Sequence, residues 1–87
     1  MPQVFIPKSM RPLVGDQEVV AADGGRVRDI IDDLERRFPG FKDRLCESGQ
    51  LRPGLTVAVD GSVAALGMLQ SVRPDAEIHF LPALGGG

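Results

Sequence analysis

Residues 26–38 carry the strongest pattern in the chain, an apolar stripe with a period of about 3.6 residues. The stripe consists of Val27, Ile30, Ile31, Leu34 and Phe38. Pro39 and Gly40 follow it directly and predict that the helix ends there. The chain has 87 residues, and this is its one substantial helical pattern. A single helix must bury its apolar side against a sheet, so we expect a two-layer α+β domain.

The opposite side of this predicted helix is charged. Acidic residues gather near its start and arginines near its end, as the helix dipole favours. The spacing predicts ion pairs between Asp32 and Arg36 and between Asp33 and Arg37. The carboxylates of this surface are interpreted as solvated and ion-paired, and they are Asp29, Asp32, Asp33 and Glu35.

Short apolar alternations on both sides of the helix predict strands. The predicted strands are 3–7, 18–21, 56–59, 62–65 and 77–81. Asp60 and Gly61 form the strongest hairpin signal in the chain. Residues 41–45 are expected to form a short helical turn, 47–54 are predicted as loop, and 66–72 show no clear period. The predicted order is two strands, the helix and three strands.

The alternation within the strands also predicts which side chains face the helix. Those predicted to face the core are Val4, Ile6, Ile78 and Phe80. Those predicted to face away from it are Phe5, Val63, His79 and Leu81.

Composition and charge exclude several classes of function. The net charge is −2 with basic and acidic residues interleaved, and Trp and Tyr are absent, which argues against nucleic acid and anionic membranes as partners. Cys46 and His79 are the only residues of their types, so an internal disulfide and a Cys/His zinc site are excluded. We expect one domain without a bound metal or cofactor, in a cytoplasmic, reducing compartment.

Several stretches together resemble a known family. They are the hairpin VDGS, the last strand and exit EIHFLPALGGG, the segment IPKSMRPLVGD and the helix DIIDDLERRFPGFKDRL. The chain resembles the ThiS/MoaD family of ubiquitin-like sulfur carriers, and looks most like the cysteine-biosynthesis carrier and the molybdopterin synthase small subunit. The resemblance implies a β-grasp fold over residues 1–82, with a mixed four- to five-stranded sheet on one main helix. Residues 83–87 would be a flexible tail ending in Gly-Gly.

The resemblance also implies a reaction at the end of the chain. In the family, an E1-like enzyme uses ATP to adenylate the C-terminal carboxylate, here that of Gly87, and a sulfur donor then displaces AMP to leave a thiocarboxylate. Gly86 and Gly87 lack side chains, so this segment can thread a narrow channel close to enzyme backbone. The carrier would supply the substrate atom, whereas the partner enzyme would supply the catalysis and bind the ATP.

The family's contacts with the E1-like enzyme and the downstream synthase fall on a further set of positions. They correspond here to Phe5, Arg11, Val63, Leu81, Leu84 and Gly85. Two plainer interpretations stay open, since isolated apolar residues are common on surfaces and Arg11 could be a solvated loop charge. Cys46 has no visible base or helix N-terminus to lower its pKa, so it is interpreted as a spectator thiol. His79 is interpreted as a surface histidine.

The sequence leaves two other functions open. The same carboxylate could form an isopeptide bond with a lysine, which would make the chain a protein modifier. The domain could also be an interaction module with an inert tail. If the chain is a carrier, the sulfur could go to cysteine, molybdopterin, thiazole or a specialised metabolite.

Overall fold

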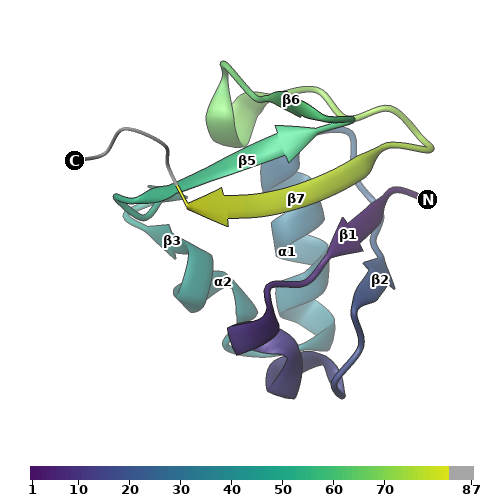
Figure 1. Ribbon diagram of the computed structural model, residues 1–87, viewed down its shortest axis with the longest axis vertical. Coiled ribbons are helices and arrows are strands. Elements are labelled where there is room, and N and C mark those ends of the chain that lie inside the picture. Colours follow the sequence, from purple (N-terminus) through teal and green to yellow (C-terminus); the bar gives the residue numbers. More distant parts are fainter. Residues whose placement is uncertain (83–87) are drawn as a thin grey trace.

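The computed structural model of the protein describes residues 1–82 and contains a five-stranded mixed sheet (Figure 1). Its strands are β1 (Gln3–Phe5), β2 (Val19–Ala21), β5 (Leu55–Val59), β6 (Ser62–Val63) and β7 (Glu77–Pro82). Their order across the sheet is β2-β1-β7-β5-β6. The first and last strands are parallel neighbours, and every other pairing is antiparallel. The two ends of the described chain therefore form the middle of the sheet.

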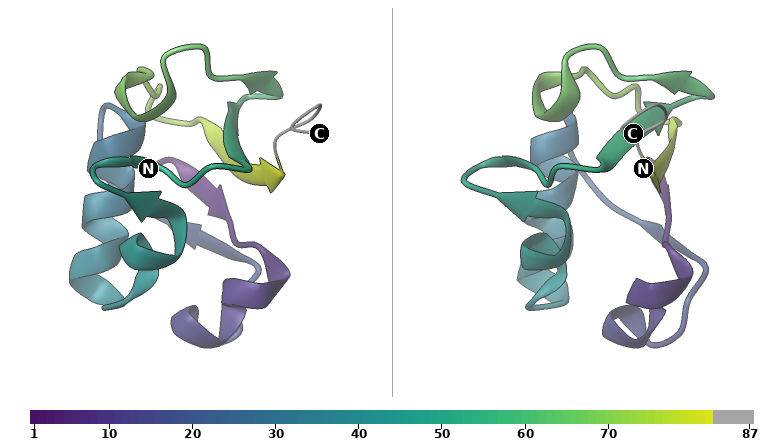
Figure 2. Two further views of the ribbon diagram at one scale, coloured as in Figure 1. Left: turned by 90° about the vertical axis from the view of Figure 1, so that its left-hand side faces the viewer. Right: turned by 60° about the vertical axis from the view of Figure 1, so that its left-hand side comes forward.

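The helix α1 (Val27–Arg37) covers one side of this sheet, together with α2 (Phe41–Leu45) (Figure 2). Four residues of the predicted stripe are fully buried, namely Val27, Ile30, Ile31 and Leu34. Phe38 is partly buried against the same core. From the sheet, the predicted residues Val4, Ile6, Ile78 and Phe80 are also buried. The predicted two-layer α+β architecture is thus confirmed, with its core between the helix and the inner side of the sheet.

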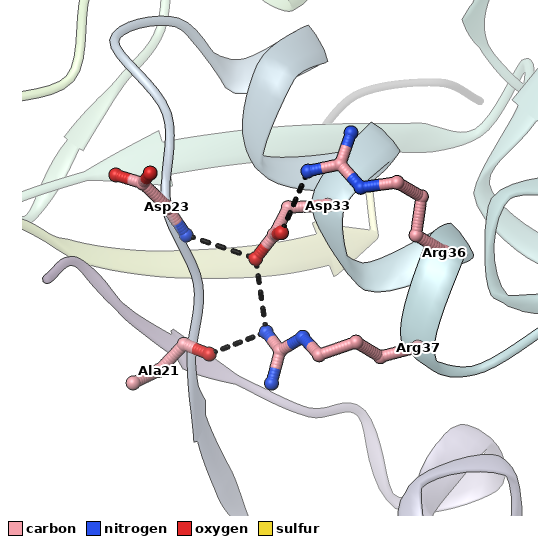
Figure 3. A network of polar contacts seen from close by, with 5 residues as sticks. All are labelled: Ala21, Asp23, Asp33, Arg36 and Arg37. Atoms are coloured by element: carbon pink, nitrogen blue, oxygen red, sulfur yellow. Dashed lines mark hydrogen bonds and ion pairs between the residues drawn. The ribbon is translucent and has the colours of Figure 1, made fainter.

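Asp33 anchors the segment that leads from β2 into α1 (Figure 3). Its carboxylate accepts hydrogen bonds from the backbone N–H of Asp23 at 3.0 Å, from Arg36 at 2.8 Å and from Arg37 at 3.0 Å. Arg37 also donates to the carbonyl oxygen of Ala21 at 2.6 Å. The hydrogen bond from Asp23 and the two arginines lower the pKa of Asp33, although desolvation opposes them.

The predicted ion pairs are confirmed in one case and wrong in the other. Arg37 pairs with Asp33 as predicted, but Asp32 pairs with Lys42 of α2 at 2.8 Å instead of with Arg36. Packing α2 beside α1 brings this lysine to Asp32, a tertiary contact that helical spacing cannot indicate. Glu35 is likewise more than a solvated carboxylate, since it accepts hydrogen bonds from the backbone N–H groups of Gly40 and Lys42.

Two segments differ from the prediction, and the first loop contains an element that was not predicted. The first loop contains a 3-10 helix, η1 (Lys8–Val14), which buries Met10 and Val14. Part of the predicted loop 47–54 is a small hairpin of β3 (Cys46–Glu47) and β4 (Gln50–Leu51), whose turn residues Ser48 and Gly49 both have positive φ.

The strand predicted over 62–65 is also shorter than expected. It ends at Val63, and the chain then turns into a second 3-10 helix, η2 (Gly67–Leu69). Leu66 and Leu69 stay exposed there while Met68 packs against the core, which is why the segment shows no clear period.

Candidate functional site

The side of the sheet that faces away from α1 carries a continuous row of side chains, which we call the outer row. Strand register places one residue from each of the five strands in it. In order from β2 to β6, the outer row is Val19, Phe5, His79, Ala58 and Val63. Residues that are paired across a sheet point to the same side, so the row is one surface. Four of its five members are apolar.

Phe5 and His79 form the centre of the outer row. Their rings stack with centroids 4.2 Å apart and planes within 11°. Both are half-buried. His79 faces outward as predicted, but it is packed against an aromatic ring, so it belongs to the surface that Phe5 makes.

Val63 and Leu81 are the exposed apolar members of this side. Val63 is 65% exposed at the β6 end of the row, and Leu81 is 41% exposed. Leu81 lies opposite Thr56, two residues beyond His79 along β7 and next to Pro82. The structure therefore places Phe5, Val63 and Leu81 on one side of the sheet, with Leu81 beside the last described residue.

The remaining predicted contact residues divide into two groups. Arg11 lies in η1, where its Nε donates to the carbonyl oxygen of Ile6 at 3.3 Å and its guanidinium is 4.0 Å from Glu18. These contacts hold it near the end of β1. The residues Leu84, Gly85, Gly86 and Gly87 lie outside the described part of the chain.

Cys46 has the surroundings of a packing residue. It is buried, and its Sγ lies 3.9 Å from the Sδ of Met68. Desolvation by burial raises the pKa of the Cys46 thiol, although the charge of Lys42 opposes this. A raised pKa disfavours the thiolate, which is the nucleophilic form.

Residues 1–82 hold neither a candidate metal site nor a candidate membrane span. In that stretch, His, Cys, Asp and Glu side chains form no cluster of three or more that could hold a metal ion. None of the helices there is both long and apolar enough to cross a membrane.

Comparison with protein families gives a match over nearly the whole chain. The model of the ThiS family matches residues 4–87. The chain belongs to the ThiS family. The resemblance stated from the sequence is therefore confirmed, and the match includes the glycines at residues 85–87.

Individual proteins similar to this ThiS-family chain support the same assignment. The sulfur carrier protein CysO of Mycobacterium tuberculosis is 34% identical over 89 residues, covering 97% of this chain and 96% of that protein. A chain in the crystal structure of the Amycolatopsis orientalis BexX/CysO complex is 32% identical, with a TM-score of 0.90 and full coverage of both chains. The small archaeal modifier protein 1 from Methanosarcina acetivorans is 21% identical with a TM-score of 0.79, covering 99% and 95% of the two chains, and is similar in fold alone.

These likenesses and the sheet order identify the fold as the ubiquitin-like β-grasp fold, as predicted. Sequence reasoning had placed four residues on the outer side, Phe5, Val63, His79 and Leu81, but not its full extent. It missed Val19 and Ala58, because the local alternation of apolar and polar residues does not indicate which side of the sheet either residue faces. Only the pairing of β2 with β1 and of β5 with β7 and β6 adds them to the row.

Proposed function

We propose that this chain is a sulfur carrier protein that acts in cysteine biosynthesis. The observation that carries this proposal is its likeness to CysO from end to end, at 34% identity over 97% of the chain. Membership of the ThiS family supports it. The chain itself would be a carrier and co-substrate rather than an enzyme.

The working group in this proposal is the carboxylate of Gly87. One of its oxygens attacks the α-phosphorus of ATP on an E1-like enzyme, which releases pyrophosphate and leaves an acyl adenylate. Sulfide then attacks the carbonyl carbon, forms the C–S bond and expels AMP, so that a thiocarboxylate remains. Gly86 and Gly87 place no Cβ beside the reacting carbonyl. ATP is bound by the activating enzyme, and this chain needs no cofactor of its own.

The outer side of the sheet is the proposed docking surface for the activating enzyme and for the protein that accepts the sulfur. Phe5, Val63 and Leu81 contribute apolar side chains to this surface, and such side chains are typical of the buried part of protein interfaces. Leu81 lies directly before Pro82, so a partner on this surface stands where residues 83–87 begin. We include Arg11, Leu84 and Gly85 among the contacts. The BexX/CysO complex supports a protein partner, because it holds a chain similar to this one.

In the same proposal, the chain consists of a β-grasp domain and a reactive tail. Residues 1–82 would present the docking surface, and 83–87 would reach the active site of the partner. Five extended residues span at most about 17–18 Å. That reach requires the partner's reactive centre to lie close to the Leu81 end of the sheet.

The proposal is tested by intact-mass measurement after incubation with an E1-like enzyme, Mg-ATP and a sulfide source. We expect one oxygen of the chain to be replaced by sulfur, and we expect no replacement when ATP is omitted. Deletion of residues 85–87, which removes all three terminal glycines, is the matched control and should abolish the change. An unchanged mass under every activating condition would contradict the proposal. Conjugates on lysines that require Gly87 would instead identify a protein modifier.

A further inference from the structure

A second apolar surface lies away from the outer side of the sheet. It is a groove of about 440 Å³ between the β3–β4 hairpin, η2 and the first turn of α1. These three elements stand on the helix side of the sheet (Figure 2). The volume falls within the range of binding sites for small ligands. The proposed carrier function makes no use of it.

Most of the groove is lined by aliphatic and thioether side chains, which are Leu51, Leu66, Met68 and Leu69. Leu66 is 65% exposed and Leu69 is 50% exposed. They are two of the five most exposed large apolar residues within 1–82, and two others belong to the outer side of the sheet. Adjacent exposed apolar side chains around a hollow are typical of an interaction site rather than of ordinary surface.

The charged group that lines the groove is Arg28. Its side chain is 52% exposed, and its nearest ion-pair partner is the adjacent Asp29, at 4.0 Å from Nε. Arg36 and Arg37 make contacts of 2.8–3.0 Å with Asp33. The guanidinium of Arg28 is thus engaged far more loosely than theirs. It offers a planar set of donors to a carboxylate beside an apolar hollow.

One wall of the groove has a strand edge available for pairing. The backbone N–H of Arg52 donates to the carbonyl oxygen of Leu45 at 2.9 Å, so the neighbouring pair of Cys46 and Leu51 is the non-hydrogen-bonded pair of the hairpin. In such a pair the backbone N–H and C=O groups point away from the partner strand. Leu51 therefore directs its backbone groups to the outer edge of β4, where an extended chain could pair with them.

Two of the three walls of the groove, η2 and the first turn of α1, are fixed relative to each other. The backbone N–H of Val27 at the start of α1 donates to the carbonyl oxygen of Gln70 at 3.0 Å, and that of Val72 donates to Gly25 at 2.9 Å. These bonds tie the segment after η2 to the beginning of α1. This part of the site is therefore preformed, which lowers the entropic cost of binding.

We propose that this groove binds an extended segment of a partner protein in which an aliphatic residue stands next to Asp or Glu. The aliphatic side chain fills the hollow between Leu66 and Leu69, and the carboxylate pairs with Arg28. The surface is separate from the outer row, so a carrier docked through its sheet can hold a second protein through the groove. The inference goes beyond the proposed carrier function and does not depend on it.

A display library of random linear peptides, selected against the immobilised full chain, tests the proposal. We expect enrichment of sequences that contain an aliphatic–acidic pair. Synthetic versions of these peptides should shift the amide resonances of Gln50, Leu51 and Leu69, and not that of Val63. Arg28→Glu should weaken their binding by about tenfold or more, because a charge-assisted hydrogen bond is lost and like charges meet. Selection on Arg28→Glu should enrich Lys or Arg in place of the acid.

Two serine substitutions at exposed apolar residues serve as controls. Leu69→Ser alters an exposed position and should keep the melting temperature while losing the peptides, whereas Val63→Ser should retain them. The proposal is overturned if selection gives no enrichment over Leu69→Ser, or if the enriched peptides lack the acidic residue. It is also overturned if light scattering shows a dimer that Leu69→Ser dissociates, since the occupant is then a second copy of the chain.

Discussion

At Gly24 the backbone passes so close to the first turn of α1 that a side chain has no room. A Cβ there would lie 2.8 Å from the Cβ of Asp29 and 2.8 Å from the backbone nitrogen of Ile30. Helix backbone cannot move aside as a flexible side chain can. The close approach brings Asp23 within hydrogen-bonding distance of Asp33, so a glycine in a loop decides how the helix sits on the sheet.

We predict that Gly24→Ala destabilises the fold by about 1–3 kcal/mol, the usual cost of overpacking. Chemical denaturation monitored by circular dichroism measures the change. Gly25→Ala is the matched control, because a Cβ at Gly25 would meet nothing within 4 Å. Equal effects of the two substitutions would show that the approach to α1 is not the cause.

Asp33 makes the stability of the fold depend on pH. Its side chain is 13% exposed, and its pKa is lowered chiefly by the hydrogen bond from Asp23. Because the native pKa lies below that of the unfolded chain, near 3.9, the stabilisation is complete above the unfolded value. It is lost as the pH falls through the native value.

Asp33→Asn should therefore lower the free energy of unfolding by roughly 1 kcal/mol at pH 7. The difference from wild type should shrink between about pH 5 and the native pKa, as Asp33 takes up its proton. Urea denaturation at a series of pH values measures this. A difference that stays constant down to the lowest pH would contradict the assignment of this pH dependence to Asp33.

At the scale of elements, the sheet produces a surface that no single strand contains. β1 and β7 lie side by side, although more than seventy residues separate them in the sequence. Their parallel register stacks Phe5 on His79, and the antiparallel strands on either side extend the row. The surface exists only when all five strands are correctly paired. A partner that binds it therefore binds only the folded sheet.

We predict that Leu81→Asp impairs docking and leaves the fold intact. The fold should tolerate the change because Leu81 is exposed. Docking should suffer because a partner would bury the charge of the new aspartate. The Michaelis constant of the activating enzyme for this chain should rise by about tenfold or more, as at interface hot spots. Ser48→Asp adds the same charge at the exposed tip of the β3–β4 hairpin, and should leave this constant unchanged. If Leu81→Asp is activated as well as wild type, the docking surface lies elsewhere.

At the scale of the whole molecule, the residues that stabilise the fold are different from the residue that is proposed to react. The apolar core lies between α1 and the inner side of the sheet, and the proposed reactive carboxylate belongs to a residue outside the described part of the chain. The elements that line the groove lie on the helix side of the sheet (Figure 2), whereas the outer row faces away from α1. Under the two proposals made above, one protein would bind to the sheet and a second to the groove.

A pair of substitutions tests this separation. Leu34→Ala removes a fully buried side chain, and should destabilise the fold by about 2–5 kcal/mol, with activation falling only as the folded fraction falls. Gly87→Ala should leave the melting temperature unchanged and slow thiocarboxylate formation. Thermal denaturation and intact-mass time courses measure the two effects. Unfolding of Gly87→Ala would show that the end of the chain is structural.

The sequence alone determined the features that depend on near neighbours in the chain. The stripe of α1, the alternation in β1 and β7 and the Asp60–Gly61 turn follow from local periodicity and turn chemistry, and all three appear in the structure. The same signals placed Phe5, Val63 and Leu81 on the outer side. Local pattern suffices there because each residue's side is set by the period of its own element.

Only the tertiary structure decided the features that depend on distant segments. The pairing of Asp32 with Lys42, the stacking of Phe5 on His79 and the groove each join parts of the chain with no common period. The β3–β4 hairpin was missed because its strands are only two residues long, too short to show alternation. Sheet order and layer packing bring these groups together, since burial of the single stripe of α1 fixes which segments meet.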